Sequence, residues 1–158
     1  MPMALPSTWS HFSGDYFIPL RIQLLARMIE RELARDLQSH FNLAVADWRV
    51  LAITCARGSS SAAEICVAFE IDRAEVSRAV SRLLKFGLVQ RERDPDHRQK
   101  MNIIPTAAGK TIFDRAQVLR NDYFVAILQD LDPEERRNFQ AALERIALRV
   151  DERRGADG

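Results

Sequence analysis

Hydroxyl and guanidinium side chains alternate along residues 73–85, a pattern suited to binding nucleic acid. Arginine can donate paired hydrogen bonds to guanine edges or phosphate, and serine can bind phosphate without filling a groove. After Glu75 no acidic residue occurs until Glu92, whereas a solvated helix face usually mixes both signs. The alternative interpretation is a cationic, solvated face with no ligand. At helical spacing the predicted DNA-contacting face comprises Arg73, Ser77, Arg78, Ser81 and Arg82.

The residues around this face specify one short helix. Asp72 can accept a hydrogen bond from the backbone N–H of Glu75, whose side chain can reach back, and Gly87 can end the helix in a left-handed conformation. The opposite face carries an apolar stripe for docking on a core, made of Val76, Ala79, Val80, Leu83 and Leu84.

The preceding segment predicts the first half of a helix-turn-helix. Residues 44–56 are apolar on nearly all sides, as in a buried helix. Ser61 and Glu64 form a capping-box pattern that opens a short helix to about Ala68, followed by a turn of about three residues. We include Ser61 among the predicted DNA contacts.

A strand-like pattern follows Gly87 and predicts a β-hairpin wing. Residues 88–93 and 100–104 are the two strands, joined by a polar turn. Arg98 near the tip is suited to a minor groove, where the negative potential favours arginine. Asp96 could hold that guanidinium by a charge-assisted hydrogen bond, which would support the wing.

Long amphipathic helices are predicted outside this lobe, at about residues 16–39, 106–129 and from 133 onward. Their apolar stripes need a partner surface, and a two-fold homodimer would also match a palindromic DNA site. The expected fold is mainly α with a small β-hairpin wing. A winged helix-turn-helix DNA-binding lobe at 44–104 joins a helical dimerisation region formed by the N- and C-terminal helices, 1–43 and 105–158.

Composition fits one domain with a real core or two small lobes, since 47% of the 158 residues are hydrophobic. The formal charge is only +1, but residues 72–100 hold eight basic against five acidic side chains, so positive charge concentrates around the predicted helix and wing. The first residues lack a signal-peptide pattern and no run is long enough to span a membrane, so we expect a cytoplasmic protein without membrane contact.

Other chemistry finds little support in the sequence. The three histidines are far apart in sequence and no Cys/His cluster occurs, so we expect no metal, no cofactor and no enzymatic activity. Cys55 and Cys66 are flanked by apolar residues, which favours buried thiols over a redox role.

The order of these elements resembles the MarR family of bacterial transcriptional regulators. The similarity is carried, over nearly the whole chain, by Ala46-Asp47-Trp48-Arg49-Val50-Leu51, Ala63-Glu64-Ile65, Asp72-Arg73 with Val76-Ser77-Arg78, Lys85-Phe86-Gly87-Leu88-Val89, Asp94-Pro95-Asp96-His97-Arg98 and Thr106-Ala107-Ala108-Gly109. The resemblance implies an obligate homodimer with interleaved terminal helices, recognition helices in major grooves and wing tips in minor grooves. It also implies a repressor released by a small effector, often an aromatic carboxylate or phenolic compound.

The residues that could line an effector site lie at the N-terminal end and in the helix at 44–56. Arg21 or His11 would meet a carboxylate there. The alternative interpretation is that Trp48 and Phe12 belong to the core and that Arg21 is solvated. Two alternatives stay open: a DNA-binding protein of this fold without an effector, and a helical dimerisation or partner-binding module. The candidate effector-binding residues are Trp9, His11, Phe12, Tyr16, Arg21 and Trp48.

Overall fold

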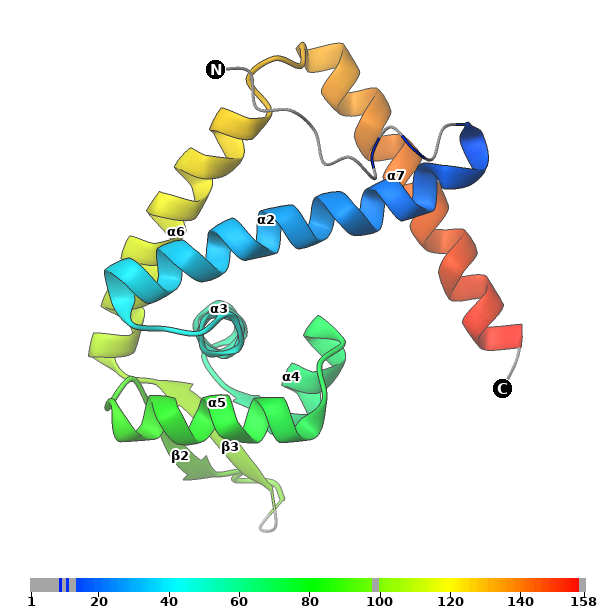
Figure 1. Cartoon of the computed structure of the whole chain (residues 1–158). Helices are drawn as coiled ribbons and strands as arrows, with labels where there is room; N and C mark the ends of the chain where they lie inside the picture. The colour runs from blue at the N-terminus through cyan, green and yellow to red at the C-terminus, as the bar shows by residue number, and fades with distance from the viewer. Residues whose placement is uncertain (1–8, 10, 12–13, 98–99, 157–158) are drawn as a thin grey trace. The chain divides into compact units, whose positions relative to one another are not determined.

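The computed structural model describes residues 9, 11, 14–97 and 100–156, and these form a mainly helical chain with one small sheet (Figure 1). The elements agree with the predicted ones to within a few residues. A short 3-10 turn, η1 (Asp15–Phe17), precedes the first long helix. The helices are α2 (Ile18–Phe41), α3 (Val45–Arg57), α4 (Ala62–Phe69), α5 (Arg73–Lys85), α6 (Ala107–Ile127) and α7 (Pro133–Ala156).

The predicted hairpin is confirmed, and the structure adds a strand that the sequence did not reveal. Strands β2 (Val89–Arg93) and β3 (Met101–Pro105) pair antiparallel, with Val89 opposite Pro105 and Arg93 opposite Met101. Strand β1 (Ser60–Ser61) pairs with the other edge of β3, which gives the order β1-β3-β2. Two residues are too few to show an alternating pattern, so sequence reasoning placed Ser61 only at a helix start.

The main core forms where α3, α4 and α5 meet, with α3 seen end-on in Figure 1. Helix α3 is buried on several sides, as its near-uniform apolarity predicted. Four residues of the predicted stripe on α5 are at most 2% exposed, namely Val76, Ala79, Val80 and Leu83. Burying four such side chains removes most of the apolar face of α5 from water, so docking on the core fixes which face remains outside.

The predicted helix caps are largely confirmed. The Ser61 hydroxyl accepts from the Glu64 backbone N–H at 3.3 Å, and Glu64 Oε2 accepts in return from the Ser61 backbone N–H at 2.7 Å. At α5, Asp72 Oδ1 accepts from the Glu75 N–H at 2.7 Å, but the predicted return bond from Glu75 is not formed in the described chain. Gly87 has a φ of +68°, the left-handed conformation expected there.

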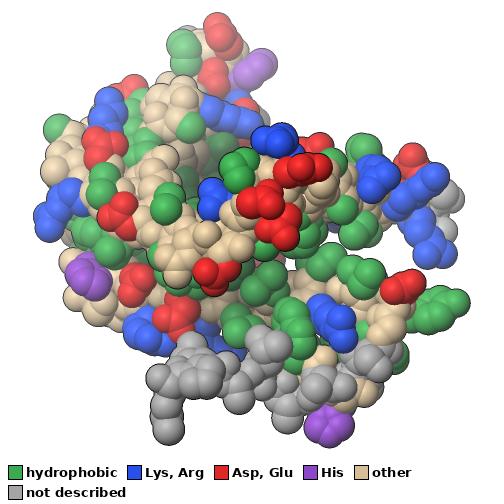
Figure 2. Space-filling model, turned by 90° about the horizontal axis from the view of Figure 1, so that it is seen from above, with side chains coloured by type: hydrophobic (Ala, Val, Ile, Leu, Met, Phe, Trp, Pro, Cys, Tyr) green, Lys and Arg blue, Asp and Glu red, His purple; other side chains and the backbone are tan. Residues whose placement is uncertain are grey.

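The chain divides into two compact units, the first ending at Ala116 and the second comprising Gln117–Gly158. Among the described residues of the second unit, no side chain is buried. On the face drawn in Figure 2, hydrophobic side chains lie at the surface between charged side chains of both signs. Within the described residues, no helix is both long and apolar enough to cross a membrane.

Candidate nucleic-acid interface

The face of α5 opposite its buried stripe is exposed and carries the predicted hydroxyl and guanidinium groups. Arg73, Ser77 and Arg78 are exposed, and Lys85 extends the cationic surface into the last turn. Ser81 is also exposed, and its hydroxyl donates to the Ser77 carbonyl at 2.9 Å. Each of these groups can therefore reach a ligand without rearrangement of the core.

Arg82 differs from its neighbours because its guanidinium already holds a protein carboxylate. Arg82 Nε and Nη2 donate to Asp47 Oδ1 at 3.0 and 2.7 Å, and Nε also approaches Oδ2 at 3.2 Å. Asp47 is 1% exposed on α3, whereas the Arg82 side chain is 41% exposed. This forked ion pair fastens α5 to α3, so Arg82 positions the helix whatever else it contacts.

Asp47 was missed as a functional residue by sequence reasoning. Besides the ion pair, its Oδ2 accepts from the Ala44 backbone N–H at 2.9 Å, so it also caps α3. The available signal was a carboxylate in a helix that is apolar on nearly all sides, because a buried carboxylate needs a cation or several donors.

Ser61 differs from the exposed residues of α5 because its side chain has a structural role. It is 7% exposed, lies in β1, and its hydroxyl both caps α4 and donates to Glu64 Oε2 at 2.9 Å. A contact to DNA through its side chain would have to compete with these bonds.

At the wing, the predicted tip residue Arg98 lies outside the described residues, as does any contact that Asp96 makes with it. Asp96 is exposed. The carboxylate that holds the wing backbone in the described chain belongs to Asp94, whose Oδ1 accepts from the backbone N–H groups of Asp96 and His97 at 2.9 and 3.1 Å.

The candidate effector residues separate into different surroundings. The Arg21 guanidinium carbon lies 5.9 Å from the Trp9 ring centroid, a cation–π contact. Trp48 is 8% exposed and packs on Phe113 with ring centroids 6.1 Å apart, so it belongs to the core. His11 is exposed and Tyr16 is 96% exposed, while Phe12 lies outside the described residues.

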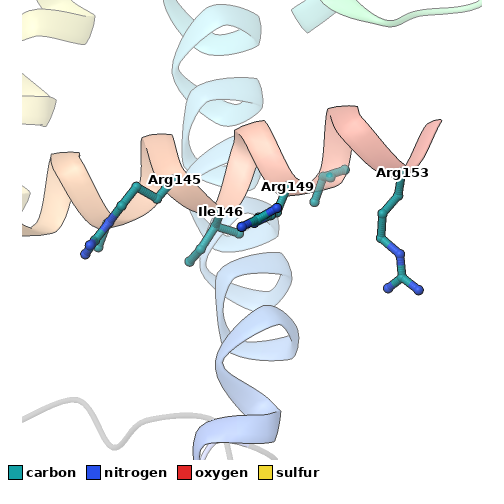
Figure 3. Close-up of a pocket in the computed structure, with 6 residues that line it drawn as sticks. Arg145, Ile146, Arg149 and Arg153 are labelled. Carbon is teal, nitrogen blue, oxygen red and sulfur yellow. The ribbon is translucent and has the colours of Figure 1, made fainter. Parts of the chain in front are cut away.

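A separate open groove of about 520 Å³ lies along α7. Figure 3 shows Arg145, Arg149 and Arg153 on one side of this helix beside Ile146. Arg149 Nη1 also contacts Glu152 Oε2 at 2.7 Å. The groove combines positive charge with apolar surface, and none of the candidate effector residues lines it.

The two cysteines are half-buried, less enclosed than expected. Burial, reinforced by the charge of Asp114 and opposed by Lys110, raises the pKa of the Cys55 thiol, which disfavours the reactive thiolate. No group of three or more His, Cys, Asp or Glu side chains in the described residues is arranged to hold a metal ion.

Comparison with known proteins shows that this fold is similar to that of transcriptional regulators. Residues 41–100, which run from the end of α2 through α3, α4 and α5 to β2 and the loop after it, match the model of the MarR family. A MarR-family transcriptional regulator from Silicibacter pomeroyi is 25% identical, with a TM-score of 0.73 over 85% of this chain and 90% of that one. No curated protein matches the chain by sequence.

Two further solved structures share the fold at lower identity. A MarR/EmrR family transcriptional regulator from Acinetobacter sp. ADP1 is 18% identical, with a TM-score of 0.79 over 89% of this chain and 99% of that one. A mutant MarR from E. coli, complexed with operator DNA, is 22% identical, with a TM-score of 0.73 over 84% of this chain and 99% of that one. The resemblance inferred from the sequence is thereby confirmed: this chain has the winged-helix fold of MarR-family transcriptional regulators, and its helix-turn-helix and first wing strand match the model of that family.

Proposed function

We propose that the protein is a homodimeric, sequence-specific DNA-binding repressor that is released from a pseudo-palindromic operator by a small effector. The observation that carries the proposal is the exposed cationic face of α5 in a lobe of this family. Four residues of its apolar stripe are buried, so Arg73, Ser77 and Arg78 are held outward. That arrangement suits insertion of α5 into a major groove, with side chains directed at base edges and phosphates.

The side chains of α5 divide into two roles under this proposal. Arg78 is exposed, and no atom of the described residues holds its guanidinium, so it is the best candidate for reading a base. Arg73 near the helix start and Ser77 are suited to the phosphate backbone or a base. Arg82 acts first through its Asp47 ion pair and contributes to DNA binding by the orientation that this pair gives to α5.

Homodimerisation is supported by apolar side chains exposed in the second unit. The stripe residues Ile127, Phe139 and Val150 are 44–56% exposed, although a helical unit of this kind ordinarily buries its apolar stripes. We infer that a second copy covers them. A dimer also presents two α5 helices, which would match two half-sites about one DNA turn, or 10–10.5 bp, apart.

For the effector, the pairing of Arg21 with Trp9 supports an anionic aromatic compound. An aromatic carboxylate could meet the guanidinium while stacking on the indole, and it would act by favouring a dimer shape whose α5 helices no longer match both half-sites. We expect such a compound to weaken operator binding of the native protein more than that of an Arg21→Ala variant.

The proposal can be tested by selecting bound duplexes from a random DNA pool, followed by sequencing. We expect enrichment of an inverted repeat with one helical turn between half-site centres. The Arg78→Ala variant should lose this enrichment. The Arg27→Ala variant is the control, because it removes the same charge from an exposed position on α2. If the native protein enriched no motif, the proposal would be contradicted. If it enriched a motif but aromatic acids did not weaken binding to it, specific DNA binding would stand and the proposed effector would be wrong.

A further inference from the structure

The carboxylate of Asp94 is the point where the hydrogen bonds of the described part of the wing converge. Asp94 follows β2, and its side chain is 13% exposed. Oδ1 accepts from the Asp96 and His97 backbone N–H groups at 2.9 and 3.1 Å, and Oδ2 accepts from Asn102 Nδ2 at 3.1 Å. Asn102 lies in the central strand β3, between Ser61 and Glu92, so the carboxylate joins the loop backbone to the middle of the sheet.

Lys100 extends this network from the wing to the helix-turn-helix. Its ammonium nitrogen lies 3.7 Å from Asp94 Oδ2 and 3.3 Å from Glu64 Oε1. Glu64 is in the first turn of α4 and is itself fixed by the Ser61 backbone N–H. The wing is therefore connected to the start of α4 by charged groups as well as by the β1–β3 pairing.

Backbone bonds close the same loop. The Asp94 N–H donates to the Lys100 carbonyl at 2.9 Å, and the Lys100 N–H donates to the His97 carbonyl at 2.8 Å. An exposed ion pair alone contributes little. A carboxylate that accepts from two backbone N–H groups and an amide fixes more of the chain than one pair does.

We propose that Asp94 is the positioning residue of the wing, holding residues 94–97 and Lys100 in one conformation and, through Lys100, in one orientation against α4. This inference rests on the proposed DNA-binding function, in which the wing must meet a groove next to the one occupied by α5. It assigns the role of supporting the wing to Asp94 in place of Asp96, whose carboxylate accepts no hydrogen bond from the described residues. The pKa of Asp94 is held below its usual range, chiefly by the hydrogen bond from the Asp96 backbone N–H. The bonds from Asn102 and His97 and the charge of Lys100 act in the same direction, and burial opposes them.

The chain offers a matched pair of variants, Asp94→Ala and Asp96→Ala. Both remove one carboxylate from the same loop, so both increase the attraction of the wing for DNA by one charge. We expect Asp94→Ala to bind selected operator DNA about fivefold to tenfold more weakly, roughly the loss of one groove or phosphate contact, and Asp96→Ala to bind no more weakly than the native protein. Asp94→Asn retains an oxygen that can accept from the two backbone N–H groups, so it should recover part of the loss.

A measurement without DNA separates this inference from the proposed function. In the native protein the amide NMR signals of Asp96 and His97 should shift together as Asp94 titrates in acid. The charged groups facing it are Lys100 and, beyond Lys100, Glu64. The acid transition should vanish in Asp94→Ala and persist in Asp96→Ala, with thermal unfolding confirming that each variant folds.

The outcomes show which of the two carboxylates, Asp94 or Asp96, positions the wing. Equal affinity of the two alanine variants, a larger loss with Asp96→Ala, or an acid shift that survives Asp94→Ala would overturn the inference. If the native protein bound no DNA, the proposed function would fail, and the amide titration alone would still confirm or refute the role of Asp94.

Discussion

At the scale of single residues, two neighbouring arginines on α5 have different surroundings. Arg78 is exposed, whereas Arg82 grips the buried Asp47 through two nitrogens. Sequence reasoning placed both on one DNA-contacting face, because helical spacing gives the direction of a side chain but not its partner. The partner of Arg82 is 35 residues earlier in the chain.

Replacing the two arginines should therefore have different effects on DNA binding and on stability. Arg78→Ala should weaken specific DNA binding by about 1–3 kcal/mol and change the free energy of unfolding by less than about 0.5 kcal/mol. Arg82→Ala should lower the free energy of unfolding by about 2–4 kcal/mol, below the upper range for a buried ion pair because the guanidinium is partly exposed.

Chemical denaturation and DNA titration of both variants measure these effects, and Arg27→Ala is the control for loss of a cation. Equal stability of the Arg78→Ala and Arg82→Ala proteins would show that the Asp47 pair does not fasten α5.

At the scale of elements, helices and caps were the most predictable features. Their signals are local: Ser61 with Glu64, Asp72 and Gly87 each act within about four residues. The two-residue strand β1 and the ion pair of Asp47 with Arg82 depend on residues far apart in the chain, so local patterns did not reveal them.

The start of α6 depends on a close approach that only glycine permits. A Cβ on Gly109 would lie 2.0 Å from the Leu88 carbonyl oxygen, which also accepts from the Thr106 N–H. Gly109→Ala should therefore destabilise the protein by about 1–3 kcal/mol, the usual cost of overpacking. Gly155→Ala in α7 is the matched control, since nothing lies within 4 Å of the position that a Cβ would take there.

Thermal unfolding of the two glycine variants gives the comparison. If Gly109→Ala destabilised the protein no more than Gly155→Ala, the close packing of α6 against the Leu88 backbone would be contradicted.

The cap of α4 should make stability depend on pH. The Ser61 backbone N–H, then its hydroxyl and Lys100, hold the pKa of Glu64 below its usual range. A carboxyl whose pKa is lower in the folded state contributes stability that is complete above its unfolded pKa and is lost as pH falls through the folded pKa. The loss should begin below about pH 4.3 and be smaller in Glu64→Gln.

Melting temperatures of the native and Glu64→Gln proteins between about pH 3 and 6 provide the measurement, within the usual titration range of carboxyl groups. Parallel curves across this range would show that the α4 cap does not contribute through the charge of Glu64.

At the scale of the whole molecule, the lobe and the second unit pose different problems for sequence reasoning. The lobe of α3, α4, α5 and the strands satisfies its own apolar pattern within one chain, so its fold was predictable. In the second unit the stripes of α6 and α7 do not become buried, and the stripe residues Ile127 and Val150 remain 44% and 56% exposed. The sequence indicated that these stripes need a partner surface. It could not identify that surface, because the pattern of one chain does not say which copy or segment covers it.

We expect the exposed face of α5 to bind a specific DNA sequence, and fluorescence anisotropy with the DNA flanking the protein's own gene tests this directly. The native protein should bind this duplex more tightly than a scrambled one, lose affinity steeply with added salt, and lose its preference on Arg78→Ala. Equal, weak binding to both duplexes by the native and Arg78→Ala proteins alike, together with no motif from the random pool, would contradict this expectation.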